Sequence, residues 1–130
     1  MYQYKIKKVN RILDGDTIEA ELDLGFNVTL TQIIRLVGID SPEIHTLNED
    51  HKKYGQRAKE KLNEYFSYGN GDIVISTLKP NSSDKYGRIL GTVYKEGQNL
   101  TASEYMIANN YAWYYDGKTK SCDYSILAKL

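Results

Sequence analysis

The sequence lacks several features that define specialised classes of protein. It holds one cysteine, Cys122, so it can form no internal disulfide and no cysteine-based metal site. No apolar run approaches the roughly 20 residues of a membrane-spanning helix, and the N-terminus, MYQYKIKKVN, has no apolar stretch typical of a secretory signal. These absences predict a cytoplasmic protein with no membrane partner. A single chain leaves open a secreted mature form or a phage or plasmid origin.

The sequence also lacks an excess of either charge. Its 130 residues include 17 Lys and Arg and 17 Asp and Glu, so the formal net charge is zero. Nucleic-acid-binding domains are usually basic, and this balance alone argues against such a partner. The charges are segregated, however: residues 1–13 hold four bases and no acid, and residues 14–23 hold five acids and no base. Each run, taken by itself, is equally typical of a solvated surface.

No repeat or linker divides the chain, and its length predicts one domain, residues 1–130, with a short tail or helix at 118–130. Alternating apolar residues, turn residues and helical spacing give the coarse order of elements. We expect strands at 2–6, 17–22, 27–37, 72–78 and 89–94, helices at 54–66 and 101–109, and loops at 38–53 and 79–88. This order predicts a mainly β fold with α, a five-stranded Greek-key barrel of the OB type with two to three helices. A mixed α+β sheet with another strand order fits the same pattern.

Three acidic residues lie at predicted strand ends. Asp16 follows the first strand in the turn Asp14-Gly15-Asp16, and Asp40 and Glu43 follow the third strand. Carboxylates brought together by hairpin pairing suit a hard, oxygen-seeking cation such as Ca²⁺. The alternative is that these residues only form turns, which Asp favours.

Two arginines also stand at strand ends. Arg35 interrupts an apolar stretch, and Arg88 ends the segment Asp84-Lys85-Tyr86-Gly87-Arg88 before the last strand. A guanidinium in an apolar strand needs a partner, and its planar donors suit phosphate oxygens. A salt bridge from Arg35 to Asp40 or Glu43 explains it equally well.

These segments together resemble the staphylococcal nuclease (thermonuclease) family. The resemblance spans roughly residues 10–112, in order and spacing. The matching segments are Asp14-Gly15-Asp16-Thr17, Arg35-Leu36-Val37-Gly38-Ile39-Asp40-Ser41-Pro42-Glu43, Tyr54-Gly55 with Ala58, and Asp84-Lys85-Tyr86-Gly87-Arg88. Each segment is weak evidence alone, but four in order form a specific pattern.

The resemblance implies an OB-fold and a Ca²⁺-dependent endonuclease that cleaves DNA and RNA, single-stranded or frayed, with little sequence preference and leaves 3′-phosphate ends. It implies Ca²⁺ ligands at Asp16, Asp40 and the Ser41 carbonyl, a general base at Glu43, scissile-phosphate contacts from Arg35 and Arg88, and contacts to a neighbouring phosphate from Lys85 and Tyr86. The alternative is a catalytically inert OB-fold module that binds nucleic acid or protein. We expect a monomer.

The sequence departs from the family pattern near its C-terminus. The family commonly ends with a longer third helix, whereas Cys122 to Leu130 allows two turns at most. The family also tends to place a tyrosine against the nucleotide base in this region. Trp113, Tyr114 and Tyr115 offer aromatic rings there, for base stacking or core packing, and the sequence alone assigns none of them.

Overall fold

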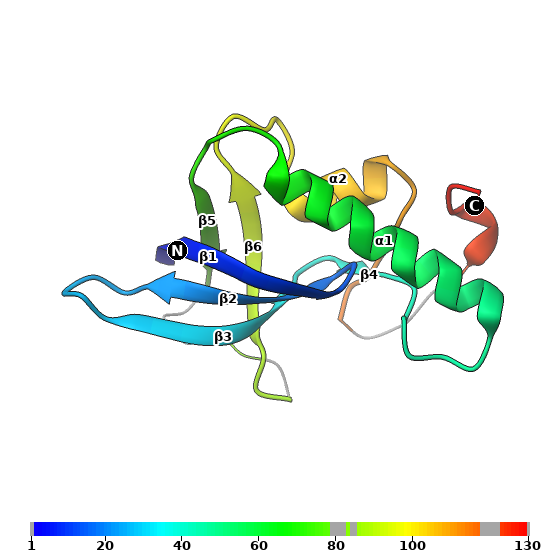
Figure 1. Cartoon of the computed structure of the whole chain (residues 1–130), viewed down its shortest axis with the longest axis horizontal. Helices are drawn as coiled ribbons and strands as arrows, with labels where there is room; N and C mark the ends of the chain where they lie inside the picture. The colour runs from blue at the N-terminus through cyan, green and yellow to red at the C-terminus, as the bar shows by residue number, and fades with distance from the viewer. Residues whose placement is uncertain (1, 79–82, 84–85, 118–122, 130) are drawn as a thin grey trace.

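The computed structural model describes residues 2–78, 83, 86–117 and 123–129. The elements in chain order are β1 (Tyr2–Asp14), β2 (Thr17–Asp23), β3 (Thr29–Leu36), β4 (Ile39–Asp40), α1 (Glu49–Ser67), β5 (Ile73–Thr77), β6 (Ile89–Lys95), α2 (Ala102–Ala108), β7 (Trp113–Tyr114) and the 3₁₀ turn η1 (Tyr124–Ile126). Figure 1 shows the strands gathered at one side, α1 running diagonally across the molecule and η1 near the far end of α1.

Five strands close into a barrel in the order β1-β2-β3-β6-β5. All neighbouring pairs are antiparallel except β3 and β6, which run parallel. The prediction of a five-stranded barrel of the OB type with two to three helices is confirmed, with two α-helices in the described residues, and the alternative strand order is excluded. The short strands β4 and β7 pair with each other outside the barrel, with Asp40 opposite Trp113.

The barrel core follows from the period-2 pattern of its strands. Residues pointing inward from β2 and β3, such as Ile18 and Ile34, are fully buried. The apolar face of α1, which includes Ala58, Leu62 and Tyr65, packs against the same core. The helix α1 therefore covers one end of the barrel.

Two predictions about the segment 38–53 were wrong. This segment was predicted to be a loop, but it holds β4, and α1 begins at Glu49 rather than at residue 54. Asn48 caps the helix by accepting a hydrogen bond from the His51 N–H at 3.1 Å. The first turn of α1 is polar, so apolar spacing could not reveal it.

The second helix agrees with its sequence pattern. Thr101 and Glu104 form the predicted capping box, in which the Thr101 hydroxyl accepts from the Glu104 N–H at 3.1 Å and Glu104 accepts from the Thr101 N–H at 2.8 Å. Within the described part of the C-terminal tail, the chain forms one 3₁₀ turn. Tyr124 of this turn stacks on His51 of α1, with ring centroids 3.7 Å apart.

A buried lysine joins α1 to the barrel. Lys95, the last residue of β6, is only 5% exposed, and its ammonium group donates to the Phe66 carbonyl near the end of α1. Its backbone N–H donates to the Tyr65 hydroxyl at 3.1 Å.

In the described residues, no helix is both long and apolar enough to span a membrane.

Candidate active site

Strand pairing brings the turn between β1 and β2 to the end of β3. Thr17 lies opposite Arg35 in the β2–β3 register, and the Leu36 N–H donates to the Asp16 carbonyl at 2.8 Å. The chain then turns at Gly38 into β4, which carries Asp40. Asp16, Arg35 and Asp40 therefore meet at one end of the barrel. Asp16 is distant from the other two in the chain, and a turn separates Arg35 from Asp40.

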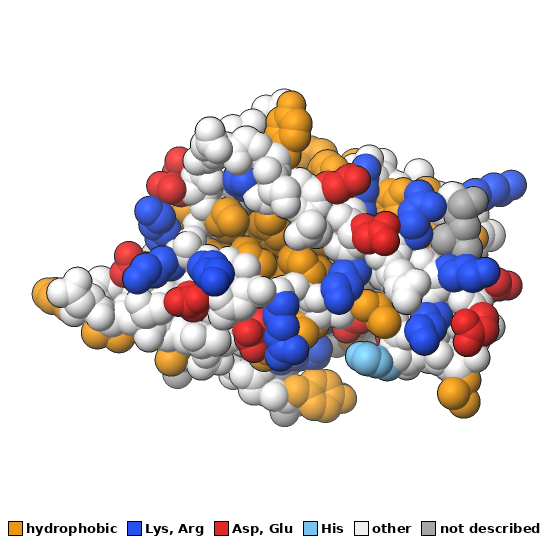
Figure 2. Space-filling view, in the orientation of Figure 1, with side chains coloured by type: hydrophobic (Ala, Val, Ile, Leu, Met, Phe, Trp, Pro, Cys, Tyr) orange, Lys and Arg blue, Asp and Glu red, His pale blue; other side chains and the backbone are white. Residues whose placement is uncertain are grey.

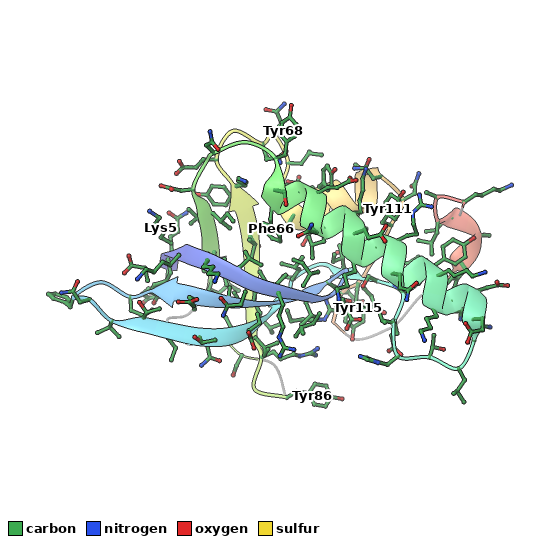
Figure 3. All side chains as sticks on the ribbon, in the orientation of Figure 1. Lys5, Phe66, Tyr68, Tyr86, Tyr111 and Tyr115 are labelled. Carbon is green, nitrogen blue, oxygen red and sulfur yellow. The ribbon has the colours of Figure 1, made fainter. Side chains whose placement is uncertain are left out.

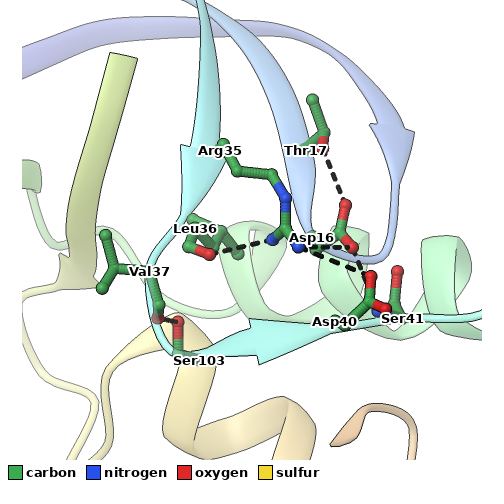
Figure 4. A network of polar contacts seen from close by, with 8 residues as sticks. All are labelled: Asp16, Thr17, Arg35, Leu36, Val37, Asp40, Ser41 and Ser103. Atoms are coloured by element: carbon green, nitrogen blue, oxygen red, sulfur yellow. Dashed lines mark hydrogen bonds and ion pairs between the residues drawn. The ribbon is translucent and has the colours of Figure 1, made fainter. Parts of the chain in front are cut away.

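Arg35 lies between the two aspartates. Its Nη2 atom is 3.5 Å from Asp16 Oδ2 and 3.4 Å from Asp40 Oδ1, and the side-chain exposures of all three residues are 9–11%. Its Nη1 atom donates to the Leu36 carbonyl at 3.0 Å. Figure 4 shows this network of a guanidinium held by two carboxylates and one carbonyl. The salt bridge predicted as an alternative for Arg35 is present, and it involves Asp16 as well as Asp40.

Further contacts fix the orientation of the Asp16 carboxylate. Its Oδ1 atom accepts from the Thr17 hydroxyl at 2.7 Å, and its Oδ2 atom accepts from the Ser41 N–H at 3.0 Å. These bonds tie the β1–β2 turn to the residue that follows β4 (Figure 4). They hold the three residues expected to bind calcium, Asp16, Asp40 and Ser41, in one place.

The donor set fits a calcium ion. Oxygens of both aspartates lie within 3.5 Å of the same Arg35 nitrogen, so they face a common point. Two buried carboxylates sharing one guanidinium leave a local excess of negative charge. Among the described residues, no hydrogen-bond partner reaches the buried Ser41 hydroxyl. Oxygen-only ligands of this kind suit Ca²⁺, which completes its 6–8 ligands with water or substrate oxygens. No group of three or more His, Cys, Asp or Glu that could hold a metal ion occurs in the described part of the chain.

A cleft of about 460 Å³ opens beside Arg35. Arg88 and Tyr86 line it from the segment before β6, and Tyr115 lines it from the segment after β7. The guanidinium carbon of Arg88 is 5.2 Å from the centre of the Tyr86 ring, and that of Arg35 is 5.8 Å from the centre of the Tyr115 ring. Figure 3 shows Tyr86 projecting at the edge of the molecule and Tyr115 nearer its middle, below α1. Lys85 lies outside the described residues.

Tyr115 is a cleft residue that the sequence left unassigned. The β4–β7 pairing, with Ile39 opposite Tyr114, brings the chain after β7 back beside Arg35, and the Tyr115 N–H donates to the Gly38 carbonyl at 2.9 Å. Trp113 is buried and Tyr114 is exposed outside the cleft. The pairing of β4 with β7 decides which of these three aromatic residues lines the cleft. No local sequence pattern reveals that pairing.

Glu43 is exposed and lies near Asp14. Burial, and then the neighbouring Asp16 charge, raise the pKa of the Asp14 carboxyl above its usual range. The sequence indicated Asp14 only as a turn residue. The raised pKa of Asp14 reflects the closeness of the Asp14, Asp16 and Glu43 carboxylates.

Positively and negatively charged side chains are mixed on the molecular surface in view. Figure 2 shows Lys and Arg side chains interspersed with Asp and Glu across this face, with apolar side chains between the barrel and α1. The segregation of charge along the sequence does not produce a one-sided patch on this face. Pairing explains part of this, since Arg11 of the basic run lies 3.2 Å from Glu19 of the acidic run.

Fold and site together define a small OB-type barrel with an arginine–carboxylate cluster at the strand ends. The family model described as "Staphylococcal nuclease homologue" matches residues 33–129. The chain belongs to the staphylococcal nuclease family.

Several curated proteins are similar to this chain. "Endonuclease YhcR" of Bacillus subtilis (strain 168) is 34% identical over 110 residues, which cover 80% of this chain and 8% of that protein. An "Uncharacterized endonuclease" of Escherichia coli is 36% identical over 110 residues, covering 84% of this chain and 60% of that protein. "Endonuclease YncB" of Bacillus subtilis (strain 168) is 30% identical over 92 residues, covering 71% of this chain and 40% of that protein. The aligned part of the chain thus spans 60% or less of the length of these relatives.

Proposed function

We propose that this protein is a calcium-dependent endonuclease that hydrolyses phosphodiester bonds in DNA and RNA and leaves 3′-phosphate ends. The observation that carries the proposal is the buried Arg35 shared by Asp16 and Asp40 beside a cleft that also holds Arg88. Membership of the staphylococcal nuclease family and the endonuclease names of relatives support it. Substrate with unpaired bases, single-stranded or frayed, suits a cleft that presents tyrosine rings.

In this proposal, different residues bind the metal, contact the phosphate and accept the proton. Asp16, Asp40 and the Ser41 carbonyl would hold Ca²⁺, which when bound adds positive charge at the phosphoryl oxygens and makes water more acidic. Arg35 and Arg88 donate hydrogen bonds to oxygens on which negative charge grows during the reaction, and this favours the transition state over the bound substrate. Glu43, being exposed, can accept the proton of an attacking water molecule.

The position of Arg35 matters to this mechanism. Because two carboxylates and the Leu36 carbonyl fix its guanidinium, the group does not have to be ordered when a phosphate binds. The Tyr115 ring also lies against this guanidinium, 5.8 Å from its carbon to the ring centre. Arg88 is placed over Tyr86, and it lines the cleft from the segment before β6, whereas Arg35 lines it from β3.

A cleavage assay with a fluorogenic single-stranded oligonucleotide, in Ca²⁺ and in EGTA, tests the proposal. We expect cleavage only with Ca²⁺, a loss of about 10²–10⁴ in kcat for Glu43→Gln and of about 10²–10³ for Arg88→Met. Matched controls are Glu60→Gln, an exposed carboxylate on α1, and Arg11→Met, an exposed arginine on β1. Mass spectrometry of the products checks for 3′-phosphate ends.

Three results would count against the proposal. Wild-type protein that binds the oligonucleotide with salt-sensitive affinity and never cleaves it would indicate an inert binding module instead. Cleavage undiminished in EGTA would remove the calcium requirement. Cleavage that persists undiminished in both Glu43→Gln and Arg88→Met would remove the residue assignment.

A further inference from the structure

The cleft beside Arg35 holds an acidic residue that the proposed chemistry does not use. Asp116 lines this cleft together with Arg88 and Tyr115, and it is the one carboxylate among the described residues that do so. It is exposed. The nucleic-acid backbone is a polyanion, and a negative charge near its path weakens its binding. A carboxylate at this place is therefore unfavourable for phosphate and suits a part of the nucleotide that donates hydrogen bonds.

The backbone fixes where Asp116 stands. The Tyr115 N–H donates to the Gly38 carbonyl at 2.9 Å, which anchors the preceding residue, and the Tyr115 ring faces the Arg35 guanidinium. The Cα of Asp116 follows that of Tyr115 at about 3.8 Å. The chain then turns at Gly117, whose φ of 90° lies in the left-handed region that favours glycine. The carboxylate is thus carried next to an aromatic ring in the same cleft.

A carboxylate beside an aromatic ring distinguishes the four bases. An unpaired base stacked on a tyrosine presents its Watson–Crick edge to neighbouring side chains. An ionised carboxylate only accepts hydrogen bonds. Guanine offers two adjacent donors on that edge, N1–H and the N2 amino group, and these match two carboxylate oxygens as the fork of an arginine does. Adenine, cytosine and thymine or uracil each place their single donor group there beside an acceptor, which a carboxylate repels.

We propose that Asp116 is a specificity-determining residue that binds the Watson–Crick edge of an unpaired guanine next to the cleaved phosphate. This inference rests on the proposed function and names a preferred substrate for the same cleft. It departs from the low sequence preference that the family resemblance implies. A good bidentate contact to a base discriminates by about 5- to 150-fold. Because Asp116 is exposed and water competes for it, we expect the lower end, about fivefold to tenfold.

Cleavage of single-stranded thymidine oligonucleotides with one central dG, dA, dC or deoxyinosine, in Ca²⁺, tests the proposal. Wild-type protein should show a kcat/KM about fivefold to tenfold higher for dG than for the others. Deoxyinosine lacks the N2 amino group and should lose most of the preference, whereas 7-deazaguanine keeps both donors and should retain it. In Asp116→Asn, the amide offers one donor and one acceptor, so the preference should move from dG to dA or dC. The matched control is Glu60→Gln, which removes the same charge from an exposed position on α1 and should keep the preference for dG.

Several outcomes would overturn the assignment. Wild-type protein that cleaves all substrates equally has no guanine site. A preference for dG that survives in Asp116→Asn, or that 7-deazaguanine abolishes, would place recognition on another residue, such as Arg88 reading the O6 and N7 atoms. An equal loss of cleavage on every substrate in Asp116→Asn would show a structural role. If wild-type protein cleaves nothing, the proposed function fails, while fluorescence-anisotropy titrations of the same oligonucleotides with wild-type protein and Asp116→Asn still decide whether Asp116 selects guanine.

Discussion

Replacing Arg35 with methionine tests whether the buried guanidinium stabilises the fold by neutralising Asp16 and Asp40. Methionine keeps an unbranched side chain but removes the charge, and it leaves two carboxylates of about 10% exposure facing each other. Removing one partner of a buried ion pair costs about 3–5 kcal/mol. Taking the lower end, since water reaches the edge of this site, we expect a loss of about 3 kcal/mol. For a domain of this size that corresponds to a fall in Tm of about 10 °C.

The assay is urea and thermal unfolding in EGTA, followed by circular dichroism. Arg11→Met is the matched control, because Arg11 also pairs with a carboxylate, Glu19 at 3.2 Å, but its side chain is 62% exposed. An exposed pair contributes about 0–1 kcal/mol. An Arg35→Met variant that loses no more stability than Arg11→Met would refute the reasoning about burial. Added Ca²⁺ should recover part of the loss in Arg35→Met by replacing the missing positive charge, and a loss unchanged by Ca²⁺ would count against the calcium site but not against the ion pair.

Three further predictions concern other residues. Tyr115→Ala should weaken binding of a single-stranded oligonucleotide by about tenfold, the value of one stacked base, while Tyr114→Ala, outside the cleft, should leave fluorescence-anisotropy titrations unchanged. Hydrogen bonding from the Thr101 backbone lowers the pKa of Glu104 below 4.5, so the stability it contributes is present above pH 4.5 and lost as pH falls through the lower, folded-state value. Glu104→Gln should therefore remove this part of the acid dependence in urea unfolding. Burial raises the pKa of Asp14 above 3.8, so ionised Asp14 costs stability at neutral pH. Asp14→Asn should be the more stable form in EGTA at neutral pH, and its advantage should disappear below pH 3.8.

Local sequence patterns predicted most of the strands and helices of the fold. Alternation in β2 and the capping box at Thr101 are short-range signals, and the structure agrees with each. The start of α1 was missed because its first turn is polar and depends on the Asn48 cap. The strand β4 was missed because two residues carry no period, and its pairing with β7 links segments more than 70 residues apart.

The sequence also predicted part of the candidate site but not all of it. The order of motifs along the chain pointed to Asp16, Arg35 and Asp40 as one group, and the structure brings them together. Sequence could not show that Arg35 serves both aspartates, since this depends on where β4 runs after Gly38. Nor could it select Tyr115, which the pairing of β4 with β7 brings beside Arg35.

The contact between Lys95 and Phe66 has a consequence for how the protein folds. The last turn of α1 holds no basic residue, although a positive charge there stabilises a helix by interacting with its dipole. The barrel supplies that charge through Lys95 at the end of β6. The helix is thus complete only when β6 is in place, which couples the two in a single cooperative transition. A peptide of residues 49–67 alone should be much less helical than the same segment in the protein.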